Sequence, residues 1–169
     1  MEAFLPVFAS HYMYLTDGAE QVELVYDSQL ANENFPDLLK RSLERDRVLE
    51  RTTTGIHKDD LLFSIHGMPL KKFGSQGQQK SFLIALKLAQ YSFLHEKKGF
   101  KPLLLLDDIF DKLDELRITK LMQMVSHDDF GQIFITDTSR ERVERIFKGI
   151  GVHLNLFEID KGIVQDGTQ

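Results

Sequence analysis

Two short polar segments of the chain hold the residue types that could bind and transfer a phosphate. The first is Ser75-Gln76-Gly77-Gln78-Gln79-Lys80, which opens an apolar helix, and the second is Asp107-Asp108, which ends an apolar strand. A helix N-terminus offers unpaired backbone N–H groups and the positive end of the helix dipole, so the first segment could hold an anion. Carboxylate oxygens are the ligands that Mg²⁺ prefers, so the second segment could hold a metal.

The polar side chains of the first segment can serve either a ligand or the helix itself. Gly77 lets the backbone approach a phosphate closely, and Lys80 adds a positive charge one turn into the helix. Ser75 and Gln78 contribute a hydroxyl and an amide to such a site. The same two residues also fit a capping box, in which they satisfy the first backbone N–H groups of the helix. The sequence leaves both interpretations open.

The two aspartates can have different roles because adjacent strand residues point to opposite faces. Asp107 could hold Mg²⁺, and Asp108 could orient or polarise an attacking water. The alternative is two acids at a strand end, one of which caps the next helix. Asp114 precedes a further apolar-periodic segment and is a good N-cap by itself.

Hydrophobic periodicity and turn residues predict the elements that position these segments. In the second half of the chain, helices alternate with short apolar strands, which favours a mostly parallel sheet covered on both faces. Leu103–Leu106 does not alternate with polar residues, so we expect this strand to be buried on both sides. The last helix–strand pair could instead form an antiparallel edge. The predicted helices are residues 1–20 in part, 34–50, 76–96, 114–125 and 139–147, and the predicted strands are 22–26, 60–65, 103–107, 132–136 and 152–159.

Composition excludes several classes of protein. A chain of 169 residues with 42% hydrophobic residues is long enough for one domain with a real core. The absence of cysteine excludes disulfides and thiolate metal sites. A net charge of −5 excludes a uniformly basic surface, so any contact with DNA must be local. No segment approaches the roughly 20 apolar residues of a membrane helix, and no signal peptide is evident, so we expect a cytoplasmic protein without membrane contact.

A phosphate loop of the form G-x-x-x-x-G-K-[ST] occurs nowhere in the chain. This loop grips most of the phosphates in nucleotide-hydrolysing proteins of the P-loop class. The segments Ser75–Lys80 and Leu103–Asp108 nevertheless resemble the signature loop and the Walker B strand of ABC-type ATPases. This resemblance, without the phosphate loop, implies that the chain is the C-terminal part of such a protein and hydrolyses little or no ATP by itself.

The residues Ser75–Lys80 and Leu103–Asp114 together closely resemble the RecF family of SMC-like ABC ATPases. The segments Val25–Ser28, Arg51–Asp60 and Gly131–Thr138 agree with this resemblance, which covers nearly the whole chain. It implies an α/β fold, the C-terminal part of a P-loop (ABC/SMC-like) NTPase, with a mostly parallel sheet, flanking helices and a helical arm near the N-terminus. The implied domains are residues 1–51, the end of a helical arm lobe, and residues 52–169, the C-terminal part of the ATPase domain.

The resemblance also implies roles for individual residues. Asp107 would serve Mg²⁺ and Asp108 would be catalytic at the attacking water. Other residues would bind ATP held by a second protomer, through the signature loop, the D-loop and the switch position. His57 and Lys58 are implied as DNA contacts, although Lys58 replaces an arginine and cannot grip an anion bidentately. The implied ATP-binding residues are Ser75, Gln76, Gly77, Gln78, Lys80, Asp114, Thr136 and Thr138.

The function implied by the resemblance is ATP-dependent binding of DNA at single-strand gaps and junctions of single- and double-stranded DNA. Members dimerise around ATP and Mg²⁺, act with RecO and RecR to promote RecA loading, and use ATP hydrolysis to time release. Two alternatives remain: an ABC or SMC ATPase of another class, such as a transporter subunit or a chromosome-structure protein, and a scaffold without catalysis. Against the transporter, the chain lacks Leu-Ser-Gly-Gly-Gln, and Thr136-Asp137-Thr138 stands where transporters carry a histidine.

Overall fold

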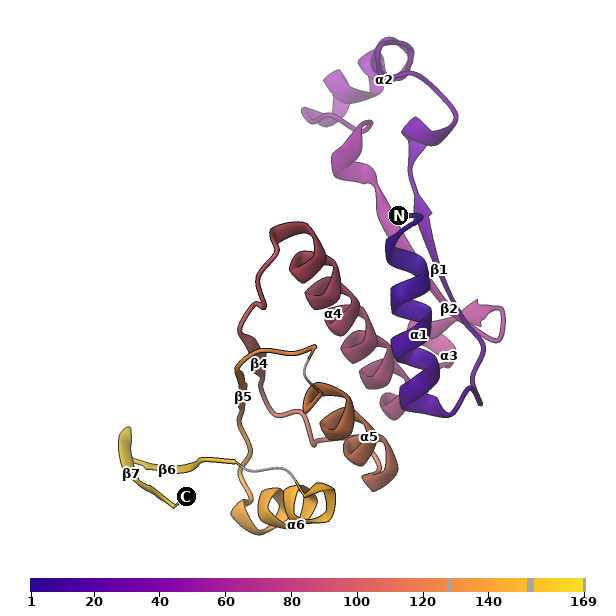
Figure 1. Ribbon diagram of the computed structural model, residues 1–169. Helices are drawn as coiled ribbons and strands as arrows, with labels where there is room; N and C mark the ends of the chain where they lie inside the picture. Colours follow the sequence, from indigo (N-terminus) through magenta and orange to yellow (C-terminus); the bar gives the residue numbers. More distant parts are fainter. Residues whose placement is uncertain (128, 152–153, 169) are drawn as a thin grey trace.

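Three helices form the centre of the molecule. The computed structural model describes residues 1–127, 129–151 and 154–168. Figure 1 shows α1 lying alongside α4, and α5 packs near the N-terminal end of α4. The bounds of these helices are Phe4–Thr16 for α1, Gln76–Lys98 for α4 and Glu115–Val125 for α5.

Aromatic rings and small side chains join α1 to α4. The ring of Phe82 lies 4.7 Å from the ring of Phe8 and 5.8 Å from that of Tyr12, measured between centroids. Ala85 and Leu88 on the same side of α4 are fully buried, so the two helices approach closely. The apolar helix after Ser75 therefore belongs to the core.

A long β-hairpin carries a small helical lobe away from this centre (Figure 1). Strand β1 (Val22–Asp27) pairs antiparallel with β2 (Asp60–Ile65) along its whole length, and β3 (Met68–Pro69) pairs with β2. The residues between the two long strands, 28–59, are called the arm lobe below. The arm lobe contains the short helices η1 (Gln29–Ala31) and η2 (Ile56–Lys58) and the helix α2 (Phe35–Leu49).

Polar contacts hold the arm lobe together. Asp46 on α2 accepts hydrogen bonds from the backbone N–H of Thr53 at 2.9 Å and from its hydroxyl at 2.6 Å. Ser42 donates to the same carboxylate at 2.9 Å. The hydrogen bond from the Thr53 hydroxyl is the main cause that lowers the pKa of Asp46. The boundary predicted between residues 51 and 52 falls inside the arm lobe, between two strands that pair, and it stays a prediction.

The second half of the chain forms two small sheets. Strand β4 (Leu104–Leu106) pairs in parallel with β5 (Ile133–Ile135), and α5 lies in the connection between them. After α6 (Arg140–Ile150), strands β6 (Leu156–Asp160) and β7 (Ile163–Thr168) form an antiparallel hairpin. Figure 1 shows this hairpin standing away from the helices. A short helix, α3 (Leu70–Phe73), precedes α4.

The structure corrects the prediction of a mostly parallel sheet. In the part of the chain that it describes, β4 and β5 form the parallel pair and the other strand pairs are antiparallel. The expectation that Leu103–Leu106 is buried on both sides is also wrong. Leu104 and Leu106 are buried, whereas Leu103 is 63% and Leu105 70% exposed. The physical reason is that helices cover one face of this two-stranded sheet and leave the other open.

The strand predicted over residues 152–159 begins at Leu156 in the structure, and Val152 and His153 lie outside the described residues. Its partner β7 was not predicted from the sequence. Among the described residues, β6 pairs with β7 in a separate sheet and not with β4 or β5, so it is not the antiparallel edge that was the alternative for this end of the chain.

Candidate functional site

The carboxyl ends of β4 and β5 bring Asp107, Asp108 and Thr136 together. The backbone N–H of Thr136 donates to the carbonyl of Leu106 at 3.0 Å, which extends the parallel pairing by one step. The hydroxyl of Thr136 donates to the carboxylate of Asp107 and accepts from the backbone N–H of Asp108 at 3.2 Å. Thr136 therefore fixes both aspartates, although the two strands lie far apart in the sequence.

The backbone of Asp108 adopts a conformation that residues with side chains rarely use. Its φ is +47°, in the left-handed region, where a side chain is strained unless its surroundings enforce the geometry. The ammonium group of Lys80 donates to the carbonyl oxygen of Asp108 at 3.1 Å and supports this turn. Lys80, predicted as a ligand of ATP, thus contacts the loop that carries the predicted catalytic aspartate.

The aspartates suit a metal that arrives with its own ligands. Both residues are exposed, and Thr136 occupies one carboxylate oxygen of Asp107, Oδ1. Among the described residues there is no group of three or more His, Cys, Asp or Glu that could hold a metal ion. Mg²⁺ commonly takes one or two carboxylates and completes its shell with water and substrate phosphates. The residues at this strand end therefore fit Mg²⁺ with a nucleotide better than a structural metal.

The capping box predicted at Ser75 is present. The backbone N–H of Gln78 donates to the hydroxyl oxygen of Ser75 at 3.2 Å, and the backbone N–H of Ser75 donates to Oε1 of Gln78 at 2.8 Å. The hydroxyl of Ser75 acts only as an acceptor in this arrangement, so its own hydrogen is available to an anion. Capping and ligand binding by Ser75 are therefore compatible.

The segment that opens α4 lies against the loop that leads to Asp114. A Cβ on Gly77 would come within 3.3 Å of the carbonyl oxygen of Lys112, so a larger residue would push the two apart. Asp114 caps α5 by accepting from the backbone N–H of Arg117 at 2.8 Å, and its carboxylate pairs with the Arg117 guanidinium at 3.1 Å.

A hydrogen-bonded group around Glu20, which sequence reasoning missed, joins these two loops. Oε1 of Glu20 accepts from the side-chain amide of Gln78 at 3.3 Å and from Arg117 at 2.7 Å, and Oε2 accepts from the hydroxyl of Tyr12. Arg117 also donates to the hydroxyl of Ser81 at 2.9 Å. No motif marks Glu20, because its partners come from three helices that are distant in the sequence.

The pKa of Glu20 reflects this setting. Burial acts to raise the pKa, but the hydrogen bonds from Tyr12, Arg117 and Gln78 outweigh it and hold the pKa below its ordinary value. Burial and the contact with Glu20 raise the pKa of Tyr12. Glu20 is therefore a carboxylate, and Tyr12 a neutral donor, at neutral pH.

A second ion pair that the sequence did not reveal supports the loop after β5. Arg142 on α6 donates to both carboxylate oxygens of Asp137 at 2.7 Å, and its guanidinium lies 5.8 Å from the ring centre of Phe110. Asp137 lies directly between the two predicted switch residues, Thr136 and Thr138, and Thr138 is exposed. This pair ties the loop after β5 to the loop after β4.

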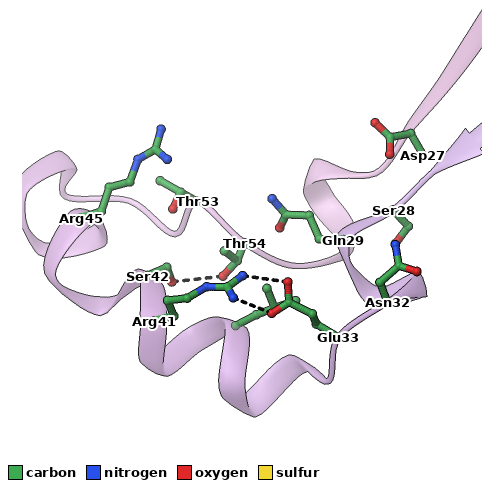
Figure 2. Close-up of a pocket in the computed structure, with 11 residues that line it drawn as sticks. Asp27, Ser28, Gln29, Asn32, Glu33, Arg41, Ser42, Arg45, Thr53 and Thr54 are labelled. Atoms are coloured by element: carbon green, nitrogen blue, oxygen red, sulfur yellow. Dashed lines mark hydrogen bonds and ion pairs between the residues drawn. The ribbon is translucent and has the colours of Figure 1, made fainter.

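The predicted DNA contacts lie elsewhere, in the arm lobe. His57 and Lys58 belong to η2 and are exposed, and the ring of His57 contacts the carbonyl of Thr52 at 3.1 Å. A polar cavity of about 520 Å³ lies in the same lobe. Figure 2 shows residues that line it, among them Arg41, which pairs with Glu33 at 2.8 Å. The cavity includes none of the residues predicted to bind nucleotide.

Comparison with solved structures shows which known fold the chain shares. A structure from work on ATP-driven dimerization and DNA-stimulated activation of SMC ATPases matches 99% of the chain and 84% of its own length, with a TM-score of 0.59 and 12% identity. The chain therefore has the fold found in SMC-type ATPases. A structure of the recombination mediator RecF with ATP, from the RecFOR pathway, matches 99% of the chain and 44% of its own length, with a TM-score of 0.70 and 25% identity.

Comparison with known sequences defines the homologues. RecF of Flavobacterium johnsoniae is 52% identical over 94% of the chain, and RecF of Bacteroides thetaiotaomicron is 46% identical over 98%. No family model matches the chain. The chain is thus homologous over nearly its whole length to RecF, the DNA replication and repair protein, and it spans 44–45% of the length of these curated relatives. Within the described residues, no helix is long and apolar enough to cross a membrane.

Proposed function

We propose that the chain is the signature-bearing part of an ATP-dependent DNA-binding machine of DNA repair. In this proposal, ATP is held between two protomers. Ser75, Gln76 and Gly77 of one protomer face the γ-phosphate that a phosphate loop, supplied by residues outside this chain, grips on the other. The observation that carries the proposal is the capped N-terminus of α4, where the hydroxyl of Ser75 accepts from the backbone N–H of Gln78 and keeps its own hydrogen for a ligand at the helix end.

The aspartates at the strand end complete the proposed chemistry. Asp107 would hold Mg²⁺, which neutralises charge on the phosphates when it is bound, and Asp108 would orient water for attack. The hydroxyl of Thr136 holds Asp107, and Lys80 holds the turn at Asp108. Asp114 and Thr138 would lie at the interface with the second protomer. Without a phosphate loop, we expect the chain alone to turn over little or no ATP.

The proposed biological role follows from the homologues. We propose that ATP-dependent dimers bind DNA at single-strand gaps, with His57 and Lys58 of the arm lobe as DNA contacts. They would act in the cytoplasm with RecO and RecR to promote RecA loading, and hydrolysis would time their release. The arm lobe supports this proposal because it projects from the centre on a hairpin, where it could reach a ligand too large for a cleft (Figure 1).

The test of the proposal is ATP-dependent dimerisation, measured by light scattering. The chain is joined to the part of its Flavobacterium johnsoniae homologue that it does not match and compared with Ser75→Arg and Ser75→Asp variants. Aspartate is as good a helix cap as serine but repels phosphate, so it separates the two roles of Ser75. We expect ATP to drive dimers of the unchanged protein and neither variant to dimerise. Normal dimerisation of both variants would leave Ser75 as a helix cap only and favour the scaffold alternative.

A further inference from the structure

Both ends of the Gln78 side chain are held inside the protein. Its carbonyl oxygen accepts from the backbone of Ser75 at 2.8 Å, and its amide group donates to Glu20 at 3.3 Å. The amide nitrogen carries a second N–H that neither bond uses, so the two bonds fix the place of the side chain without using all its donors. Gln78 therefore sets the position of Ser75, and Glu20 sets the position of Gln78.

Glu20 also holds the other loop. Its carboxylate accepts from Arg117 at 2.7 Å, and Arg117 in turn pairs with Asp114 at 3.1 Å. The side chains of Glu20 and Arg117 are only 10% and 18% exposed, whereas that of Asp114 is 60% exposed. Charged hydrogen bonds between buried groups are strong, and their loss leaves a buried partner unsatisfied. The carboxylate of Glu20 thus connects the two loops and fixes one relative to the other.

We propose that Glu20 is a positioning residue that fixes the segment Ser75–Lys80 relative to the loop that carries Asp114. Both loops then present their ligand groups together. The use of these loops for ATP rests on the function proposed above. The positioning itself is a property of this chain without nucleotide, so it can be tested separately.

The test is hydrogen–deuterium exchange of the chain in the absence of nucleotide, read in peptides that cover residues 75–80 and 112–118. We expect Glu20→Gln to speed exchange about tenfold or more in both peptides, because one substitution releases Gln78 and Arg117 together. Glu23→Gln is the matched control, since Glu23 is exposed and its carboxylate accepts a hydrogen bond from the hydroxyl of Ser64 at 3.4 Å. It should leave both peptides unchanged. Faster exchange in one peptide alone, or in neither, would overturn the proposal.

Two further variants guard against general unfolding. Gln78→Glu keeps an acceptor for the backbone of Ser75 but places a second carboxylate against Glu20. We expect it to speed exchange in residues 112–118, with which Gln78 makes no hydrogen bond. Combining Glu20→Gln with Gln78→Glu exchanges the amide and the carboxylate. It should return residues 75–80 to within about threefold of the unchanged chain, whereas residues 112–118 should stay fast because Arg117 still lacks its carboxylate partner. If residues 75–80 of the combined variant exchange as fast as in Glu20→Gln, the contact between positions 20 and 78 is not what positions this loop.

These outcomes are independent of ATP. Failure of the nucleotide-driven dimerisation test would remove the proposed use of the two loops but would not change their exchange. Conversely, if Glu20→Gln does not speed exchange in both peptides while ATP still drives dimers, Ser75 reaches nucleotide without help from Glu20.

Discussion

At the scale of single residues, Glu20 has to remain charged where water barely reaches it. Its carboxylate accepts hydrogen bonds from Tyr12 on α1, Gln78 on α4 and Arg117 on α5. Arg117 also pairs with Asp114, which lies in the loop before α5. Three donors to one carboxylate compensate the loss of water. The folded protein therefore binds the Glu20 proton less readily than the unfolded chain does.

This difference predicts how stability depends on pH. The pKa of Glu20 is lower in the folded state than its unfolded value of about 4.3, so its contribution is complete above that pH and is lost as the pH falls through the folded value. Glu20→Gln should lower the free energy of unfolding at pH 7 by about 1.5–3 kcal/mol. Urea titrations at several pH values should show the gap to the unchanged chain narrowing in acid. A gap independent of pH would contradict the charged state assigned to Glu20.

The pair of Asp137 and Arg142 gives a second prediction at this scale. Asp137 has a side chain that is 1% exposed, so Arg142→Gln leaves a buried carboxylate without its partner. We expect a loss of about 2 kcal/mol, less than for a fully buried pair because the arginine itself is partly exposed. Urea unfolding measures it. Arg145→Gln on the same helix breaks an exposed pair with Glu115 and should leave the midpoint almost unchanged. Equal losses of the free energy of unfolding in the two variants would mean that burial of Asp137 does not strengthen its ion pair.

At the scale of elements, the helix ends are defined by local residue chemistry. Ser75, Asp114 and Ser139 cap α4, α5 and α6, and Gly99 ends α4 in a left-handed conformation with φ of +72°. Such signals lie within a few neighbouring residues, so the sequence predicted the helices closely. Strand pairing depends on partners far along the chain, which is why the antiparallel β6–β7 hairpin and the open face of β4 could not be predicted.

Two glycines with open surroundings should respond oppositely to alanine. Neither Gly99 nor Gly149 would bring a Cβ within 4 Å of another atom, so packing does not distinguish them. Gly99→Ala forces alanine into the left-handed region and should destabilise by about 1 kcal/mol. Gly149→Ala lies within α6 and should stabilise by about 0.5–1 kcal/mol. Thermal unfolding of the two variants tests this, and shifts of the same sign would contradict the backbone argument.

The candidate site divides in the same way. Ser75, Asp107, Asp108 and Thr136 could be singled out because each lies at an element end with a recognisable residue pattern. Glu20 and Arg142 could not, because they act through side chains that meet only in the folded protein. Hydrophobic periodicity predicts which face of a helix is buried. It does not predict which charged side chain will contact which loop.

At the scale of the whole molecule, many large apolar side chains are exposed, and two groups of them lie on strands in the second half of the chain. Leu103, Leu105 and Phe134 lie on the open face of β4 and β5, and Phe157 and Ile159 lie on the β6–β7 hairpin. Apolar surface of this kind usually marks a contact with another protein surface.

The open face should make the isolated chain bind apolar dyes. We expect Leu105→Thr to reduce the fluorescence of bound anilinonaphthalene sulfonate while the melting temperature stays nearly constant, because threonine suits a strand and Leu105 is exposed. Leu104→Thr is the matched control on the buried face and should lower the melting temperature strongly. Unchanged dye binding in Leu105→Thr would place the dye elsewhere.

The β1–β2 hairpin has a mechanical consequence. Only Gln21 separates Glu20 from the first residue of β1, and the carbonyl of Gln21 accepts from the backbone of His66 at 2.8 Å, beyond the end of β2. The hairpin therefore connects the arm lobe, through a single residue, to the carboxylate that accepts a hydrogen bond from Gln78. A rotation of the arm lobe would move Glu20 and, through it, the segment that opens α4. By thermodynamic reciprocity, a ligand that fixes this segment would restrict the movement of the β1–β2 hairpin.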